Sequence, residues 1–173
     1  MITASDLHAI MPAATGANID RFWQPLNDAM DAYQINTPAR QAAFLAQIGH
    51  ESGSLHYVRE IASGAAYEGR LDLGNNQPGD GPRFRGRGLI QITGRANYQA
   101  CGDALGIDLI NDPEALEQPA LAALSAAWWW DAHGCNALAD ASLFQRLTRT
   151  INGGLNGLAE RTAMWERAKE QLT

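Results

Sequence analysis

TPARQAAFLAQIGHESG, residues 37–53, carries the clearest helix signal in the chain. Thr37 is a favoured N-cap and Pro38 is favoured at the first helical position, so the pair predicts a helix that begins there. Its buried side is expected to carry Phe44, Leu45 and Ile48. Gly53 predicts the end of the helix near residues 52–53. The stretch therefore predicts a buried helix that ends at the sequence His-Glu-Ser-Gly.

Helical patterns on both sides of this stretch predict a mainly α fold in one domain, residues 1–173. Thr3 and Asp6 suit the start of a short first helix. Apolar residues three and four apart predict an amphipathic helix with Ile19, Phe22, Trp23, Leu26, Met30 and Tyr33 on one side. Further helices are expected over 119–134, about 142–151 and about 158–172. Trp128-Trp129-Trp130 face three directions on a helix, which favours core packing over stacking on a ligand.

Residues 62–88 interrupt the helical pattern with seven glycines and two prolines. Repeated Gly and Pro mark turns, so a small irregular or β-containing segment is expected around residues 62–93. A long irregular segment inside a compact domain is more often a functional surface than a linker.

Bulk composition excludes several classes of protein. The 173 residues are 46% hydrophobic and 18% charged, as in globular domains. A net charge of −6 argues against a general nucleic-acid binder. Residues 1–12 lack the basic and apolar regions of a signal peptide, and the apolar stretch 120–132 is too short to span a bilayer. We expect a protein held in a cytoplasm, monomeric by default, without stable membrane association.

Neither metal nor cofactor is predicted. The two cysteines, Cys101 and Cys135, are too few for a disulfide scaffold and lack Cys-x-x-Cys spacing, so two buried thiols are expected. The alternative is a single disulfide that forms after the protein is released from the cytoplasm. His50-Glu51 does not begin a His-Glu-x-x-His zinc motif, because residue 54 is Ser. The four histidines are scattered: His8, His50, His56 and His133.

Glu51 and Glu60 are the first candidates for chemistry. Glu51 ends an apolar helix, where the helix dipole disfavours negative charge, and a carboxyl that keeps its proton suits a general acid. Glu60 lies nine residues on, and the break at Gly53 allows the two carboxyl groups to face each other. Glycosidic bond cleavage uses such a pair. An exposed glutamate at a frayed helix end is the alternative for Glu51.

Residues 86–94, GRGLIQITG, form the second candidate segment. Glycine allows backbone to approach a ligand closely. Gln91 and Thr93 share one side of an expected extended strand, alternating with Ile92, and would present an amide and a hydroxyl to a sugar or a water. The alternative is a buried strand whose polar groups pair internally. Positive charge is concentrated around this segment. Residues 83–95 contain no acidic residue and four arginines, Arg83, Arg85, Arg87 and Arg95.

Four motifs in order resemble glycoside hydrolase family 19, which contains chitinases and the endolysins of phages and related particles. They are HESG at 50–53, VRE at 58–60, GRGLIQITG followed by Asn97-Tyr98, and INGG at 151–154. YEGR at 67–70 and the segment 74–81 are similar to the endolysin branch. The resemblance covers about residues 20–172.

The resemblance implies a lysozyme-like, two-lobed helical fold and an inverting mechanism. It implies Glu51 as general acid, Glu60 as general base and Thr93 as the residue that helps hold the attacking water. It also implies positions that contact the sugar or belong to the hydrogen-bond network of the general acid (acid-network positions): Gln91, Asn97, Tyr98, Asn152 and Arg161. Plant-type members place the second glutamate in a longer loop, so Glu68 is a rival base or a substrate-binding residue, with Glu60 preferred.

The expected function is that of an endolysin, which hydrolyses the glycan backbone of peptidoglycan at N-acetylmuramic acid for host cell lysis. The protein would stay in the host cytoplasm until a holin-like or other route lets it reach the wall in the periplasm. A chitinase with the same machinery is the second hypothesis, although no signal peptide or chitin-binding module is found. A catalytically silent wall-binding module is disfavoured, because such a module would not need Glu51, Glu60 and Thr93 together. A toxin delivered between bacteria would use the same hydrolytic chemistry as an endolysin.

Overall fold

The computed structural model of the chain describes residues 1–172, and its elements are mainly helices. The α-helices are α1 (Ala4–Ile10), α2 (Gly16–Ala32), α3 (Pro38–Glu51), α4 (Asp80–Arg83), α5 (Arg95–Leu105), α6 (Pro119–Ala132), α7 (Cys135–Asp140), α8 (Phe144–Asn152) and α9 (Leu158–Gln171). Three 3-10 turns join them: η1 (Ala65–Tyr67), η2 (Leu71–Leu73) and η3 (Pro113–Glu117). The mainly helical fold class is confirmed.

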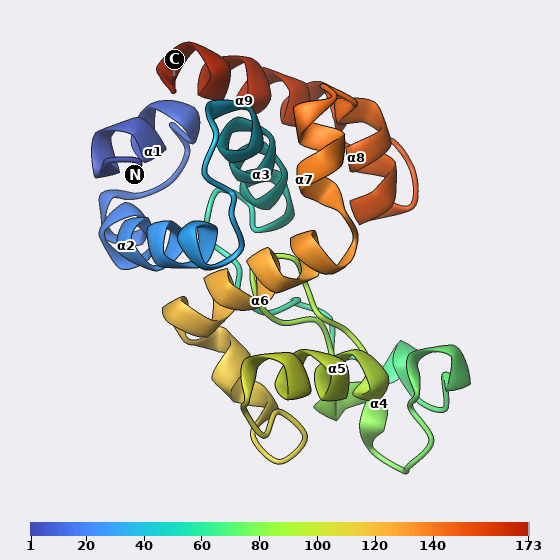
Figure 1. Cartoon of the computed structure of the whole chain (residues 1–173). Helices are drawn as coiled ribbons and strands as arrows, with labels where there is room; N and C mark the ends of the chain where they lie inside the picture. The colour runs from blue at the N-terminus through green and yellow to red at the C-terminus, as the bar shows by residue number, and fades with distance from the viewer. Residues whose placement is uncertain (173) are drawn as a thin grey trace.

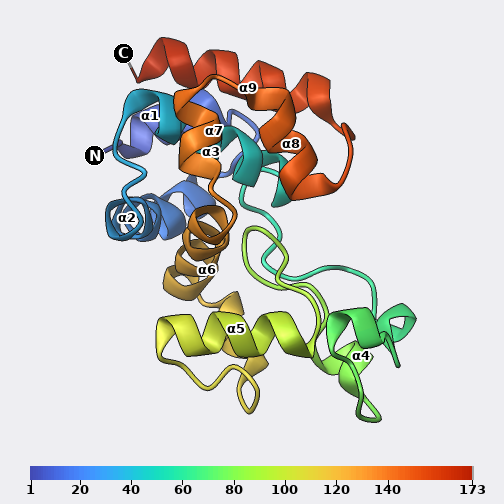
Figure 2. The same ribbon diagram turned by 45° about the vertical axis from the view of Figure 1, so that its right-hand side comes forward.

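Two hydrophobic clusters divide the chain into two lobes. The larger cluster takes buried side chains from α1, α2, α3, α6, α7, α8 and α9. The smaller cluster lies among α5, η3 and the segment around Phe84 and Ile92. Helix α6 lies between the two groups in both views and contributes to both clusters (Figures 1 and 2). The two-lobed architecture implied by the resemblance is therefore confirmed.

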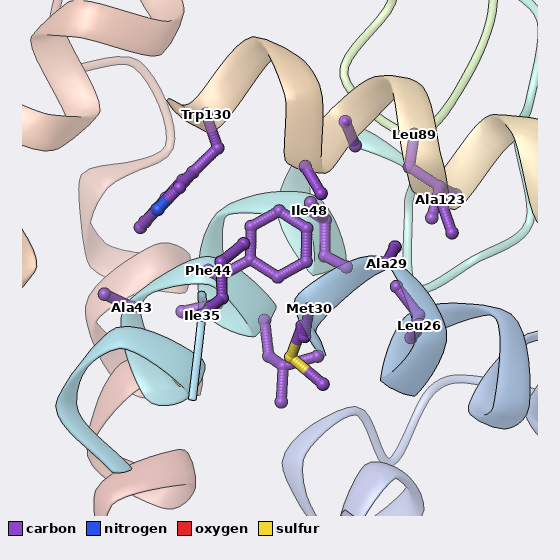
Figure 3. Packing of buried hydrophobic residues seen from close by; sticks show 14 of the residues in the cluster. Leu26, Ala29, Met30, Ile35, Ala43, Phe44, Ile48, Leu89, Ala123 and Trp130 are labelled. Atoms are coloured by element: carbon purple, nitrogen blue, oxygen red, sulfur yellow. The ribbon is translucent and has the colours of Figure 1, made fainter. Parts of the chain in front are cut away.

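Helix α3 forms the centre of the larger lobe. Thr37 caps it as predicted, because its hydroxyl accepts a hydrogen bond from the backbone N–H of Arg40 at 3.3 Å. Every residue from 42 to 49 is buried. Phe44 meets Trp130 of α6 edge to face at 5.3 Å, and side chains of α2 close the other side of the ring (Figure 3). This packing fixes the axis of α3 and hence the place where its last residue, Glu51, emerges.

The tryptophan triplet of α6 joins the core as predicted. Trp130 is fully buried in the larger cluster. Trp128 and Trp129 are half-buried against the smaller one. The two cysteines are free, buried and in different clusters, Cys101 in the smaller and Cys135 in the larger. Burial raises the pKa of each thiol to about 12.

The segment 62–93 is irregular, as expected. Its β structure within the described residues consists of isolated antiparallel bridges, Arg59 with Arg87 and Arg87 with Ile92. The extended strand predicted through Gln91 is wrong, because Gln91 has φ +45° and so lies in the left-handed region. None of the described helices combines the length and the apolar character that a membrane crossing requires.

Candidate active site

The chain reverses direction directly after Glu51. Gly53, Ser54 and Leu55 have φ values of +56°, +59° and +67°, and three left-handed residues in a row turn the backbone sharply. The hydroxyl of Ser52 stabilises the turn, since it donates to the Ile48 carbonyl at 2.7 Å and accepts from the Leu55 N–H at 2.9 Å. Glu60 therefore does not continue the helix of Glu51, as the sequence predicts from Gly53.

Glu51 is held by an arginine from the far end of the chain. Arg161 of α9 donates to Glu51 Oε1 at 2.5 Å, and its side chain is only 1% exposed, against 21% for Glu51. Glu51 ends the helix as predicted, but its nearest polar partner is a buried cation, which the local sequence does not indicate. The guanidinium stabilises the charged carboxylate that remains after a proton has left. Arg161 thus lies where the resemblance implies an acid-network residue.

A chain of buried polar groups continues from this ion pair. Arg161 also donates to Gln47 Oε1 at 2.6 Å and to the Asn156 carbonyl at 3.1 Å. Gln47 in turn donates to the hydroxyl of Thr148 at 2.8 Å. The network links α3, α8 and α9 and fixes the guanidinium opposite Glu51. Sequence reasoning missed Gln47, although a glutamine in an otherwise apolar helix signals a buried polar contact.

Glu60 is fixed by backbone pairing with the glycine-rich segment. Its N–H donates to the Gly86 carbonyl at 3.0 Å, and neighbouring bonds hold the pair antiparallel. Side chains alternate along paired backbone, so Glu60 and Gly86 share one side while Arg59 and Arg87 take the other. A Cβ on Gly86 would collide with Gln91 Oε1 and come within 3.2 Å of Thr93 Oγ1. Gln91 and Thr93 therefore lie close to Gly86, the residue that pairs with Glu60.

The two oxygens of Glu60 differ in their contacts. Oε2 accepts a hydrogen bond from the Tyr67 hydroxyl at 2.9 Å. Oε1 is buried and has no partner in the protein. Burial, and then the hydrogen bond to Glu60, raise the pKa of Tyr67, so this hydroxyl stays a donor at neutral pH. A fixed carboxylate with one open oxygen is suited to accept a proton from water.

Thr93 and Asn97 lie on the same segment. The Thr93 hydroxyl donates to the Gln91 carbonyl at 3.0 Å, which leaves its oxygen lone pairs available. Asn97 donates to the Thr93 carbonyl at 2.7 Å and is exposed. Asn152 ends α8, and its buried Nδ2 has no partner, so its amide is free to donate to a ligand.

The substrate contact implied for Tyr98 is wrong. Its side chain is fully buried, its hydroxyl donates to the Arg85 carbonyl at 2.6 Å, and it accepts from Arg87 at 3.0 Å. Burial raises the pKa of Tyr98 to about 12. Tyr98 instead anchors the backbone 85–87 against which Glu60 is paired.

Glu68, the rival to Glu60, has both oxygens occupied. They accept the backbone N–H groups of Gly79 at 2.7 Å and Gly81 at 2.8 Å. These bonds tie two loops of the smaller lobe together. Glu68 is therefore a structural anchor in this conformation, whereas Glu60 keeps an open oxygen. Nowhere between residues 1 and 172 do three His, Cys, Asp or Glu side chains gather as potential metal ligands.

Comparisons with known proteins identify the family of the chain. The profile of glycoside hydrolase family 19, described as chitinase class I, matches residues 32–139, more than half of the chain. A family 19 domain-containing protein of Haemophilus influenzae is 32% identical over 95% of this chain and 94% of its own length. An endochitinase of Arabidopsis thaliana is 40% identical over 73% of this chain, which spans only 44% of that protein.

Solved structures of chitinases share the fold. Chitinase C of Streptomyces griseus superimposes with a TM-score of 0.79 at 28% identity, covering 99% of this chain and 76% of the chitinase. A class IV chitinase of Zea mays gives a TM-score of 0.78 at 25% identity and 99% coverage of this chain, 92% of its own. The chain belongs to glycoside hydrolase family 19 and is a chitinase-like glycoside hydrolase.

Proposed function

We propose that this protein hydrolyses the β-1,4-linked glycan backbone of peptidoglycan at N-acetylmuramic acid, with inversion, and serves as an endolysin. The observation that carries the proposal is the contrast between two carboxyl groups. Glu51 is bound to the buried cation Arg161, whereas Glu60 keeps a buried oxygen without a partner in the protein. Glu60 therefore has an oxygen that can accept a proton, and Arg161 is placed to stabilise the anion that Glu51 becomes when it gives up its proton.

Glu51 acts as the general acid in this proposal. Arg161 occupies Oε1, which leaves Oε2 to carry the proton that passes to the leaving glycosidic oxygen. As the bond between that oxygen and the anomeric carbon breaks, negative charge develops on the Glu51 carboxyl. Arg161 is already in place to stabilise this charge, so proton release requires no rearrangement of the protein.

Glu60 acts as the general base. Its Oε1 takes a proton from a water that Thr93 helps to hold, and the water oxygen bonds to the anomeric carbon from the face opposite the leaving group. Tyr67 fixes the carboxylate through Oε2. Attack from the opposite face converts a β linkage into a product that is initially the α-anomer. Gln91, Asn97 and Asn152 offer amides for sugar contacts.

Chitin is the second candidate substrate. The family profile and the solved relatives favour it, since their names are those of chitinases. Chitin and the peptidoglycan strand share the bond that is cut and differ by the lactyl ether and its peptide. Peptidoglycan is preferred because the segments 67–70 and 74–81 are similar to endolysins. Retention in the host cytoplasm, a holin-like export route and a single catalytic domain over residues 1–173 belong to the same proposal.

The experiment offers purified protein two polymers, Gram-negative sacculi and colloidal chitin, and measures new reducing ends. Mass spectrometry identifies the sugar at each new end, and NMR of fresh product identifies its anomer. We expect solubilised sacculi, N-acetylmuramic acid at the ends and initial α-anomer. Cleavage of chitin alone would establish the chitinase instead, and a folded protein that cleaves neither polymer would contradict both functions.

A further inference from the structure

The arginines of residues 83–95 do not form one open basic patch. Arg87 pairs with Glu117 at 2.8 Å, and Arg95 pairs with the buried Asp80. Arg83 donates to the carbonyls of Ile110 and Asn111. Three of the four guanidinium groups are therefore committed to contacts within the protein.

Arg85 is the exception. Its Nε is buried without a hydrogen-bond partner, and throughout residues 1–172 its guanidinium has no ion pair. The backbone of Arg85 is fixed by the hydrogen bond from Tyr98 to its carbonyl. Gly64 packs so closely that a Cβ there would lie 2.8 Å from that of Arg85. A fixed, half-buried cation without a partner is costly unless a ligand supplies the missing acceptor.

Arg85 lies where two depressions of the smaller lobe meet. One, of about 380 Å³, is lined by Glu60, Arg59, Ile61 and Arg85, among others. The other, of about 430 Å³, runs from Arg85 toward Arg83 and residues 111–114. Ile61 is 86% exposed, so the first depression presents an apolar surface beside the cation. Such a mixture suits a carboxylate carried on an apolar stem.

The carboxylates that line the two depressions form no ion pair with Arg85. Glu117 is shared between Arg87 and Arg59, the latter at 3.6 Å. Asp112 and Glu114, which also line the second depression, are exposed to solvent. Glu60 shares the first depression with Arg85 without pairing with it, so the Arg85 guanidinium remains available to a ligand.

The site adjoins the candidate base. Arg85 precedes Gly86, whose carbonyl accepts the N–H of Glu60, and Arg85 and Glu60 line the same depression. A glycan strand cut at Glu60 passes this depression, so groups that project from its sugars come within reach of Arg85. N-acetylmuramic acid carries such a group at C3, whereas N-acetylglucosamine carries only a hydroxyl there.

We propose that Arg85 binds a carboxylate carried by the C3 substituent of N-acetylmuramic acid and so favours peptidoglycan over chitin. This assignment rests on the proposed peptidoglycan hydrolase function. The carboxylate is either that of the lactyl group, free in strands without peptides, or one of the attached peptide. Both present the planar acceptor that a guanidinium binds in a bidentate manner.

The test compares Arg85→Gln and Arg85→Lys with wild type on three substrates. These are strands freed of peptide by an amidase, the same strands with their lactyl carboxylates chemically amidated, and strands that retain their peptides. Arg146→Gln is the matched control, because Arg146 is an exposed arginine on α8 in the other lobe. Circular dichroism and urea unfolding establish that each variant is folded.

We expect Arg85→Gln to lower kcat/KM about tenfold on strands that carry the recognised carboxylate, mainly through KM, and less than about twofold on amidated strands. Loss on peptide-free strands assigns the lactyl carboxylate, and loss only on peptide-bearing strands assigns the peptide. Arg85→Lys should recover part of the loss, and added salt should reduce the difference from wild type.

An equal loss on charged and amidated strands would overturn the assignment, because the role of Arg85 would then not depend on a carboxylate. Unchanged activity of Arg85→Gln on all three substrates would overturn it as well. A folded wild-type protein that cleaves none of the strands would instead refute the proposed function, so the two failures are distinguishable.

Discussion

Replacing Arg161 by methionine tests whether one buried guanidinium holds Glu51 and the neighbouring helices together. The substitution keeps much of the apolar volume and removes the hydrogen bonds to Glu51, Gln47 and the Asn156 carbonyl. Breaking a buried ion pair typically costs about 3–5 kcal/mol. Glu51 is 21% exposed, so water replaces part of the lost hydrogen bonding, and we expect about 2–4 kcal/mol.

For a chain of this size that loss corresponds to a fall in Tm of roughly 5–15 °C. Urea unfolding followed by circular dichroism measures the change. The matched control is Arg40→Met, which removes another arginine–carboxylate pair, with Asp140, at a more exposed position. It should cost clearly less than Arg161→Met, because solvent screens this exposed pair. If Arg161→Met were no more destabilising than Arg40→Met, the buried network would not hold the lobe as described.

Two further predictions concern backbone and charge. Gly157→Ala should destabilise the fold by about 2–4 kcal/mol in urea unfolding, because Gly157 has φ +68° and a Cβ would collide with the His50 ring. Gly134→Ala, at φ +65° in open space, should cost only about 1–2 kcal/mol, and equal costs would exclude the collision as the cause. Hydrogen bonds from Arg95 hold the pKa of Asp80 below its usual value, so this pair stabilises the fold above about pH 4 and is lost as the pH falls through the lowered pKa. Asp80→Asn should therefore lower the free energy of unfolding at neutral pH and approach the wild-type value in acid. A stability difference that grew as the pH fell would contradict the lowered pKa of Asp80.

Local chemistry explains what could be predicted from the sequence. The start of α3 at Thr37-Pro38 depends on a cap within four residues, and the break at Gly53 depends on one glycine. Both are short-range signals. The proximity of Gln91 and Thr93 to Gly86 does not follow from the predicted strand, because Gln91 lies in the left-handed region.

Long-range contacts were beyond sequence reasoning. Arg161 reaches Glu51 across 110 positions, so no local pattern pairs them, and only the resemblance indicated a role for Arg161. Tyr67 lies seven residues from Glu60, but their contact depends on the η1 turn. Tyr98 follows a polar asparagine and was expected to contact substrate, yet its ring fills the smaller core. A tyrosine buried with its hydroxyl paired gives the same sequence signal as one that lines a site.

The most direct test of the central claim is the initial rate of reducing-end release from sacculi by Glu60→Gln, with Glu51→Gln and Glu68→Gln measured beside it. Each variant is first shown to be folded by circular dichroism. We expect Glu51→Gln and Glu60→Gln each to lose at least about 100-fold, the contribution of a general acid or base, while Glu68→Gln stays within about tenfold of wild type. A folded Glu60→Gln that keeps wild-type activity would contradict the assignment of Glu60 as general base, and a selective loss in Glu68→Gln would transfer that role to Glu68.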